Sequence, residues 1–186
     1  MNQNTTAAFN TKQLALIGLM SAAICLLGPF SLVIPISPVP ISLGSMAVYF
    51  VVSVLGMKRG TISVIIYILL GLAGIPVFTG FTGGAGKLFG PTGGYLIGYI
   101  FMAAICGYFI DKYAGNLILQ IAGMFLGTVV CYLFGTAWLA FQASLTFPAA
   151  LAAGVLPFLP GDLVKLVLAM SIGLQLRKRL AKAALI

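Results

Sequence analysis

Apolar residues run in long uninterrupted stretches along this chain, and charged residues stand mostly where those stretches end. The first stretch, residues 13–57, carries no charge and is long enough for two membrane-spanning helices of about 20 residues each. The proline-rich segment 34–40 divides it, because proline fixes φ and lacks a backbone N–H donor. This pattern predicts a first helix over 13–31 and a second over 41–57.

Turn signals divide the remaining chain in the same way. The basic turn 58–60 separates the second helix from a third, a glycine-rich loop covers 76–92, and the turn 111–116 joins the fourth helix to the fifth. An uncharged, proline-containing segment, 141–159, precedes the last helix. The expected helices are about 13–31, 41–57, 61–75, 93–110, 117–140 and 160–178. We predict an all-α integral membrane protein, a compact bundle of six transmembrane helices forming one membrane domain over residues 1–186.

Composition supports a membrane protein. Only 6% of the residues are charged and the mean hydropathy is +1.17, whereas a soluble domain carries about 25% charged residues. The polar segment 1–12 followed by an apolar run resembles a signal peptide, but nothing after that run is hydrophilic enough to be a secreted domain. The first apolar run is therefore interpreted as a retained helix.

The net charge of +8 raises the question of a nucleic-acid partner, because basic patches attract phosphate. The basic residues form no stripe with interleaved aromatics; they cluster where apolar runs end, which is the bias expected of cytoplasmic loops. With the N-terminus inside, eight of the ten basic residues fall on the cytoplasmic side, namely Lys12, Lys58, Arg59, Lys112, Arg177, Lys178, Arg179 and Lys182. We expect a multi-pass protein of a bacterial-type plasma membrane with both termini cytoplasmic, no nucleic-acid partner, and long outer loops (32–40, 76–92 and 141–159) that form a lid.

The strongest candidate for chemistry is a pair of opposite charges in an apolar segment. Asp162 is one of only two acidic residues in the chain, and Lys165 follows it at the i, i+3 spacing that places both on one helix face. An isolated charge at the bilayer centre costs about 2.5–3.5 kcal/mol. Helix capping would explain Asp162, but it leaves Lys165 unexplained, so we favour a polar ligand contact.

The glycine-rich loop is a second candidate. It contains Gly86 and Lys87 but not the Ser or Thr that must follow them in a phosphate-binding loop, since residue 88 is leucine. A flexible linker remains the alternative. The interleaved rings of Phe78, Phe81, Phe89 and Tyr95 argue against a linker and favour a loop folded over a ligand.

Small residues at steps of four mark two helix faces. Gly123, Gly127, Cys131 and Gly135 lie in the fifth helix, where packing within the bundle is the preferred interpretation. Gly18 and Ala22 lie in the first helix, where internal packing and a docking surface for another membrane protein both remain open.

Enzymatic interpretations find little support. The chain has no histidine and no glutamate, so no zinc site, Ser-His-Asp triad or carboxylate pair is expected. A Ser–Lys hydrolase with Lys165 as base and Ser42 or Ser144 as nucleophile is the remaining enzyme hypothesis. The acid beside that lysine favours its charged form, which makes it a poor base.

Four segments resemble the BioY family: 38–42 (PVPIS), 74–80 (GIPVFTG), 90–96 (GPTGGYL) and 158–165 (FLPGDLVK). The resemblance extends over about residues 12–180. Members of this family are biotin-specific substrate-binding (S) components of energy-coupling factor (ECF) transporters. The resemblance implies a six-helix protein that captures biotin from outside, and it leaves another small vitamin or precursor as the alternative substrate.

The resemblance also implies partners and contacts. The partners would be membrane lipid, a transmembrane coupling subunit (EcfT-type) and two cytoplasmic ATPases (EcfA-type). Biotin would be the transported substrate, with no cofactor or metal and no enzymatic activity in this chain. The implied coupling-subunit contacts are Ala15, Gly18 and Ala22. The implied biotin-binding residues are Phe78, Thr79, Gly80, Gly84, Lys87, Gly93, Tyr95, Asp162 and Lys165.

We expect Asp162 to accept from the ureido N–H groups of biotin, because an ionised carboxylate only accepts. Lys165 only donates, so it suits either the ureido oxygen or the carboxylate tail.

Overall fold

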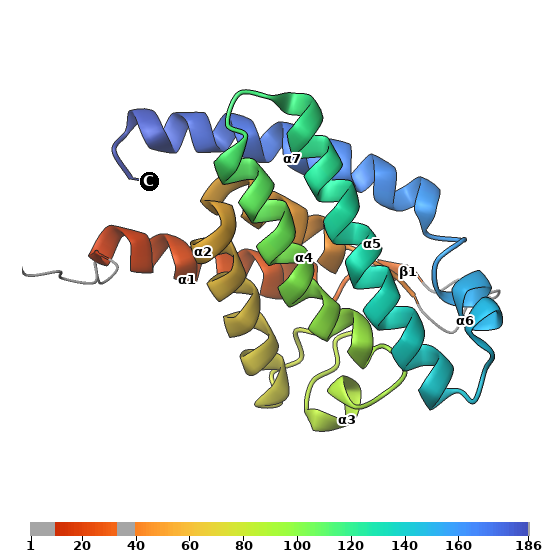
Figure 1. Ribbon diagram of the computed structural model, residues 1–186. Coiled ribbons are helices and arrows are strands. Elements are labelled where there is room, and N and C mark those ends of the chain that lie inside the picture. The colour runs from red at the N-terminus through yellow and green to blue at the C-terminus, as the bar shows by residue number, and fades with distance from the viewer. Residues whose placement is uncertain (1–9, 33–39, 186) are drawn as a thin grey trace, which may run out of the picture.

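The computed structural model describes residues 10–32 and 40–185, which form seven helices and one pair of short strands (Figure 1). The elements are α1 Thr11–Leu27, β1 Ser31–Leu32, β2 Ile41–Ser42, α2 Gly44–Leu72, α3 Ala85–Leu88, α4 Gly93–Lys112, α5 Leu117–Gln142, α6 Phe147–Gly154 and α7 Leu159–Lys182. Most of the expected polar N-terminal segment and of the first outer loop, 1–9 and 33–39, lies outside the described residues.

Four of the described helices, α2, α4, α5 and α7, are long and apolar enough to cross a membrane, and α1 is a shorter apolar helix of 17 residues. Large apolar side chains point outward, most clearly Ile118 (79% exposed) and Phe141 (80% exposed) towards the two ends of α5. Such a surface suits hydrocarbon as its solvent. The expected all-α membrane class is therefore confirmed.

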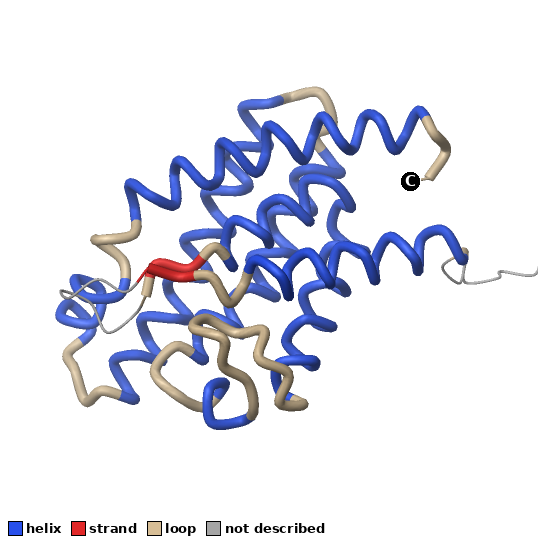
Figure 2. Tube along the Cα trace, turned by 180° about the vertical axis from the view of Figure 1, so that it is seen from behind, coloured by secondary structure: helices blue, strands red, loops and turns tan. Residues whose placement is uncertain are grey.

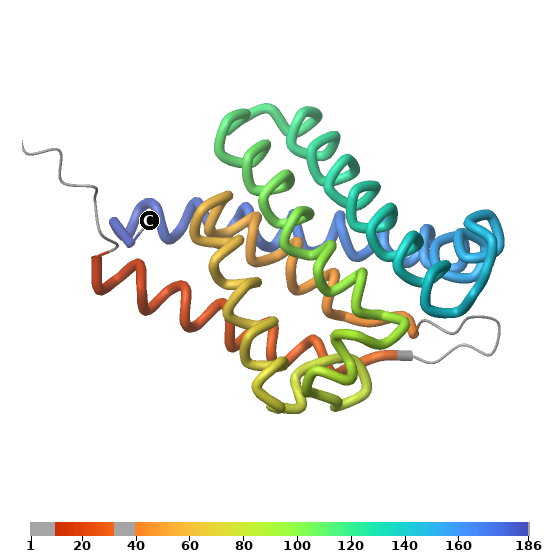
Figure 3. The backbone as a smooth tube through the Cα atoms, turned by 60° about the horizontal axis from the view of Figure 1, so that its bottom comes forward, coloured from red at the N-terminus to blue at the C-terminus, as the bar shows by residue number. Residues whose placement is uncertain are grey.

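The break within α2 differs in position from the predicted one. We expected the second and third helices to be separated at 58–60, but the helical backbone breaks at Gly56, with φ +75° and ψ −163°, and Lys58 and Arg59 lie within the following helical segment. Only glycine adopts that conformation without strain. The two halves of α2 run in different directions from this point (Figure 3).

Asp111, the second acidic residue, closes this break. Its Oδ2 accepts from the Met57 N–H (2.8 Å), which has left the helical pattern, and its Oδ1 pairs with Arg177 Nη2 of α7 (2.7 Å). A Cβ on Gly56 would lie 2.1 Å from Asp111 Oδ1. Asp111, the first residue of the predicted 111–116 turn, thus links α4 to both α2 and α7.

Other boundaries differ because short elements occupy the expected loops. The first helix ends at Leu27 rather than near 31, since the chain turns into β1, which pairs antiparallel with β2. The loop 76–92 contains α3, and the segment 141–159 contains α6, whose first turn holds Pro148, a position where proline costs little. The last helix runs on to Lys182 rather than ending near 178.

Small residues let α4 and α5 approach closely. A Cβ on Gly123 would lie 2.1 Å from the Phe109 ring, and one on Gly135 would lie 2.2 Å from the Tyr95 ring. The interpretation of this glycine ridge as internal packing is confirmed.

The α2 helix occupies the middle of the molecule, where it packs against α1, α4 and α7. The paired strands and α6 lie at one end, while the start of α1 and the C-terminus lie at the other (Figures 1 and 2).

Candidate ligand-binding cavity

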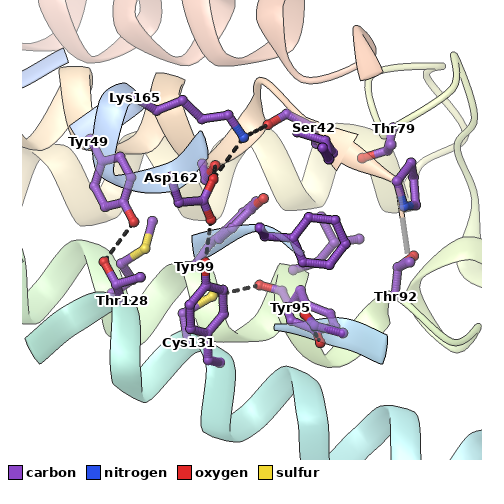
Figure 4. A pocket seen from close by; sticks show the side chains of 18 of the residues that line it. Ser42, Tyr49, Thr79, Thr92, Tyr95, Tyr99, Thr128, Cys131, Asp162 and Lys165 are labelled. Atoms are coloured by element: carbon purple, nitrogen blue, oxygen red, sulfur yellow. Dashed lines mark hydrogen bonds and ion pairs between the residues drawn. The ribbon is translucent and has the colours of Figure 1, made fainter. Parts of the chain in front are cut away.

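A cavity of about 680 Å³, including its open mouth, lies among α2, α4, α5 and α7 (Figure 4). The rest of its wall comes from the end of the molecule where the strands lie. It consists of β2, α3, Thr79, Thr92 and the end of α6. Its polar lining residues are Ser42, Ser45, Tyr49, Thr79, Lys87, Thr92, Tyr95, Tyr99, Thr128, Tyr132, Asp162 and Lys165.

The Asp162–Lys165 pair belongs to this wall. Asp162 lies in the first turn of α7, Lys165 follows it on the same face, and Lys165 Nζ contacts Asp162 Oδ1 at 2.8 Å. Each side chain is only 12% exposed. Desolvating two charges costs several kcal/mol per ion, and their attraction offsets this only with good geometry and further hydrogen bonds.

Those further hydrogen bonds come from helices far away in the sequence. Tyr132 of α5 donates its hydroxyl proton to Asp162 Oδ2 at 2.5 Å, and Ser45 of α2 donates to Oδ1 at 3.4 Å. Each carboxylate oxygen has about two acceptor positions. Oδ1 therefore has both positions occupied, whereas Oδ2 keeps one for a ligand.

Lys165 also fixes the strand segment. Its Nζ donates to the backbone carbonyl of Ser42 at 2.8 Å, while the Ser42 hydroxyl accepts from the Gly44 N–H (2.8 Å) at the start of α2. The Ser42 hydroxyl, which would be the nucleophile of a Ser–Lys dyad, thus accepts from one backbone group and donates to another, the Gly28 carbonyl (3.3 Å). Lys165 bonds the Ser42 carbonyl and not the Ser42 hydroxyl. Ser144 lies in an exposed turn outside the cavity lining.

The cavity wall is rich in tyrosine. Thr128 donates its only hydroxyl proton to the Met124 carbonyl (2.8 Å), so Tyr49 is the donor in the 2.6 Å contact between Tyr49 and Thr128. Tyr95 donates to the Gly154 carbonyl at 2.9 Å, which ties α4 to α6. Tyr99 also lines the cavity, and its hydroxyl has no hydrogen-bond partner among the described residues.

Five of the residues predicted to bind ligand line the cavity. They are Thr79, Lys87, Tyr95, Asp162 and Lys165. Lys87 lies in α3, outside the membrane-spanning segments, and burial lowers the pKa of its ammonium group. Its ammonium has no partner among the described residues, which leaves it free for a ligand.

The other predicted residues support the loop from outside the lining. Phe78 is fully buried against the Tyr67 ring (centroids 5.5 Å apart). Gly80 donates its N–H to the Pro29 carbonyl (2.9 Å), Gly84 donates to the Gly71 carbonyl (2.6 Å), and Gly93 is buried at the start of α4. The loop is therefore tied to the ends of α1 and α2.

Sequence reasoning missed the cavity residues that lie on apolar helices. Three helices supply these residues, which are Ser45, Tyr49, Tyr99 and Tyr132. The only feature of the sequence that could have indicated them was a hydroxyl group within a predicted membrane span. The structure brings them together with Asp162.

The first helix takes no part in the cavity. Ala15, Gly18 and Ala22 are exposed on α1, and a Cβ on Gly18 would meet no atom within 4 Å. The surface formed by Ala15, Gly18 and Ala22, here called the α1 small-residue face, is therefore not covered by the described parts of this chain.

Among residues 10–32 and 40–185, no group of three or more His, Cys, Asp or Glu side chains gathers to hold a metal ion. Cys25, Cys106 and Cys131 are free thiols.

The fold and cavity define a multi-pass membrane protein with an open cavity that holds a buried ion pair. The sequence pattern of the BioY family matches residues 1–182. The chain belongs to the BioY family.

Its relatives include a biotin transporter BioY2 of Lactococcus lactis subsp. cremoris, 36% identical over 174 residues that cover 92% of this chain and 94% of the relative. A biotin transporter BioY of Thermotoga maritima is 43% identical over 148 residues, covering 78% and 85%. A crystal structure of the S-component for biotin from an ECF-type ABC transporter superposes with a TM-score of 0.84 at 34% identity, covering 96% of this chain and 95% of that one.

Proposed function

We propose that this chain captures biotin from outside the cell and serves as the substrate-binding component of an ECF-type ABC transporter. The observation that carries the proposal is the buried Asp162–Lys165 pair on the wall of a cavity of about 680 Å³, in a chain that is similar over 96% of its length to a solved S-component for biotin. The family and the structural relative indicate a transporter component rather than an enzyme.

The hydrogen-bonding groups suggest how biotin would lie. The ureido ring carries two N–H donors and a carbonyl acceptor. The remaining acceptor position on Asp162 Oδ2 suits one N–H, and the third proton of Lys165 suits the carbonyl. Lys87, the unpaired cation of the lining, would then meet the carboxylate tail, while the tyrosine rings would cover the apolar thiophane ring.

Equilibrium binding of biotin to the purified chain in detergent tests the substrate. We expect saturable binding at one site that thiamine and riboflavin do not displace, and loss of that binding in Asp162→Ala. If the parent chain binds another vitamin and not biotin, the alternative of a different vitamin or precursor replaces the proposal.

Biotin and biotin amide together test the orientation. A hydrogen bond to a charged group is worth about 1.5–3 kcal/mol, so Lys87→Met should weaken biotin binding by about ten- to a hundredfold. Binding of the uncharged amide should change little. Lys58→Met, a loss of charge far from the lining, is the matched control. If Lys165→Met rather than Lys87→Met selectively loses the charged tail, the orientation is reversed.

We further propose that the single membrane domain spans the bilayer six times, with the halves of α2 counted separately. Both termini would be cytoplasmic, and the β1–β2 strands, the 73–92 segment and α6 would form an outer lid over the cavity. The start of α1 and the C-terminus lie at the same end, opposite the strands (Figures 1 and 3), and the eight basic residues fit a cytoplasmic location.

Cysteine labelling in intact cells tests this topology. In a cysteine-free background, Ser144→Cys should react with a membrane-impermeant maleimide, and Ala181→Cys should react only after the cells are opened. The reverse pattern would place the lid inside.

The proposal requires a transmembrane coupling subunit (EcfT-type) and two cytoplasmic ATPases (EcfA-type) as partners. The α1 small-residue face is the surface we propose for the coupling subunit, because it is exposed and because α1 supplies no cavity residue.

A further inference from the structure

A second, smaller hollow lies between α5 and α7, next to the ligand cavity. It encloses about 320 Å³, including its open mouth, and its hydrocarbon lining comes from Phe125, Val129, Leu159, Leu163 and Leu166. We call this hollow the α5–α7 crevice. Four of its wall residues, Tyr49, Thr128, Tyr132 and Asp162, also line the ligand cavity, so a single layer of side chains separates the two spaces.

The accessible surface of the crevice is apolar, so the polar atoms of that layer, Asp162 Oδ2 included, are not exposed to it. The hydroxyl protons of Tyr49, Thr128 and Tyr132 are all donated within the protein, at 2.6, 2.8 and 2.5 Å respectively. A buried water needs about two to four polar partners. The crevice therefore favours hydrocarbon over water.

The mouth of the crevice faces outward from the bundle. Phe125 and Leu163 at its rim are each 51% exposed, and both belong to helices long enough to span the membrane. The phase outside this mouth is therefore acyl chain. An unfilled apolar space loses dispersion contacts along its whole lining.

We propose that an acyl chain of a bilayer lipid occupies the α5–α7 crevice and packs against the ring of Tyr132. This chain then completes the outer side of the wall whose inner side holds Asp162. The lipid site does not depend on which molecule fills the larger cavity, so it stands or fails independently of the biotin proposal.

Photolabelling tests the site in the full chain. The protein is reconstituted in nanodiscs with a phosphatidylcholine that carries a diazirine in one acyl chain, and adducts are located by mass spectrometry after illumination. Leu166 is diagnostic, because it lines the crevice but is only 4% exposed. A lipid at the outer surface does not reach it. Met170, one helical turn further on and 3% exposed, lies outside the crevice and is the unlabelled control.

We expect adducts on Leu166 and none on Met170. Val129→Trp fills the crevice from α5 and should abolish the Leu166 adduct. Ile118→Trp, at a position that is 79% exposed at the start of the same helix, should leave it unchanged. Leu163→Trp and Leu168→Trp form the equivalent pair on α7, should a substitution on α5 impair folding. Absence of the Leu166 adduct in the parent, or its persistence in both crevice-filling variants, overturns the proposal.

Discussion

At the scale of single residues, the charge on Asp162 is held by groups from three helices. Lys165 comes from the same helix, Ser45 from α2 and Tyr132 from α5. Tyr132 occupies one of the two acceptor positions on Asp162 Oδ2. The other position on that oxygen has no donor among the described residues. Tyr132 thus positions the carboxylate, and a ligand in the proposed orientation would use the remaining acceptor position.

Tyr132→Phe should weaken biotin binding about tenfold, because it removes a hydrogen bond to a charged group and keeps the ring in place. Titration calorimetry in detergent measures the change. Tyr108→Phe, at the other end of the bundle where the hydroxyl contacts Lys112, is the matched control and should bind as the parent does. Equal affinities in both variants would remove Tyr132 from the site.

At the scale of secondary-structure elements, the break in α2 depends on one glycine and one acid. Gly56 takes a backbone conformation closed to other residues, and Asp111 captures the N–H group that the break releases. The Asp111–Arg177 pair is partly exposed, so its own contribution is small. The conformation of Gly56 matters more than the ion pair.

Gly56→Ala should destabilise the protein strongly, because the new methyl group meets Asp111 and the positive φ is strained. We expect a loss of at least about 2 kcal/mol, seen as a lower midpoint in a thermal size-exclusion assay. Gly18→Ala adds the same methyl group in open space on a regular helix and should be neutral or slightly stabilising. A Gly56→Ala protein as stable as Gly18→Ala would contradict this account.

At the scale of the whole molecule, the proposed ligand cavity and the proposed docking face lie on different helices. The cavity draws on α2, α4, α5 and α7, whereas α1 lies outside its lining. We therefore expect ligand capture and contact with the proposed coupling subunit to be separable by mutation.

Gly18→Trp should leave biotin binding by the purified chain unchanged and abolish both co-purification with the coupling subunit and biotin uptake by cells. Close helix contact in lipid requires small residues, and an indole on the α1 small-residue face prevents it. Leu133→Trp on the outward face of α5 is the control for a bulky lipid-facing residue. Normal uptake by the Gly18→Trp variant would move the docking surface elsewhere.

The sequence predicted best those features that depend on residues close together in the chain. Charge-free runs located the helices, and the isolated Asp162 and Lys165 marked the cavity. Local signals were less informative for boundaries. The basic residues at 58–59 indicated a helix end, but the chain bends two residues earlier, since φ at Gly56 and not charge placement decides the direction of the backbone.

The sequence alone determined the solvent, the helical class and the presence of a buried ion pair, because an apolar chain with so few charges has few other ways to satisfy its backbone and its charged groups. Only the tertiary structure decided which groups surround that pair. Ser45, Tyr49, Tyr99 and Tyr132 converge from helices far apart in the chain, and Phe78 turns into the core while Lys87 turns to the cavity. Helix packing brings such residues together, and no spacing along the chain encodes which hydroxyl will meet which carboxylate.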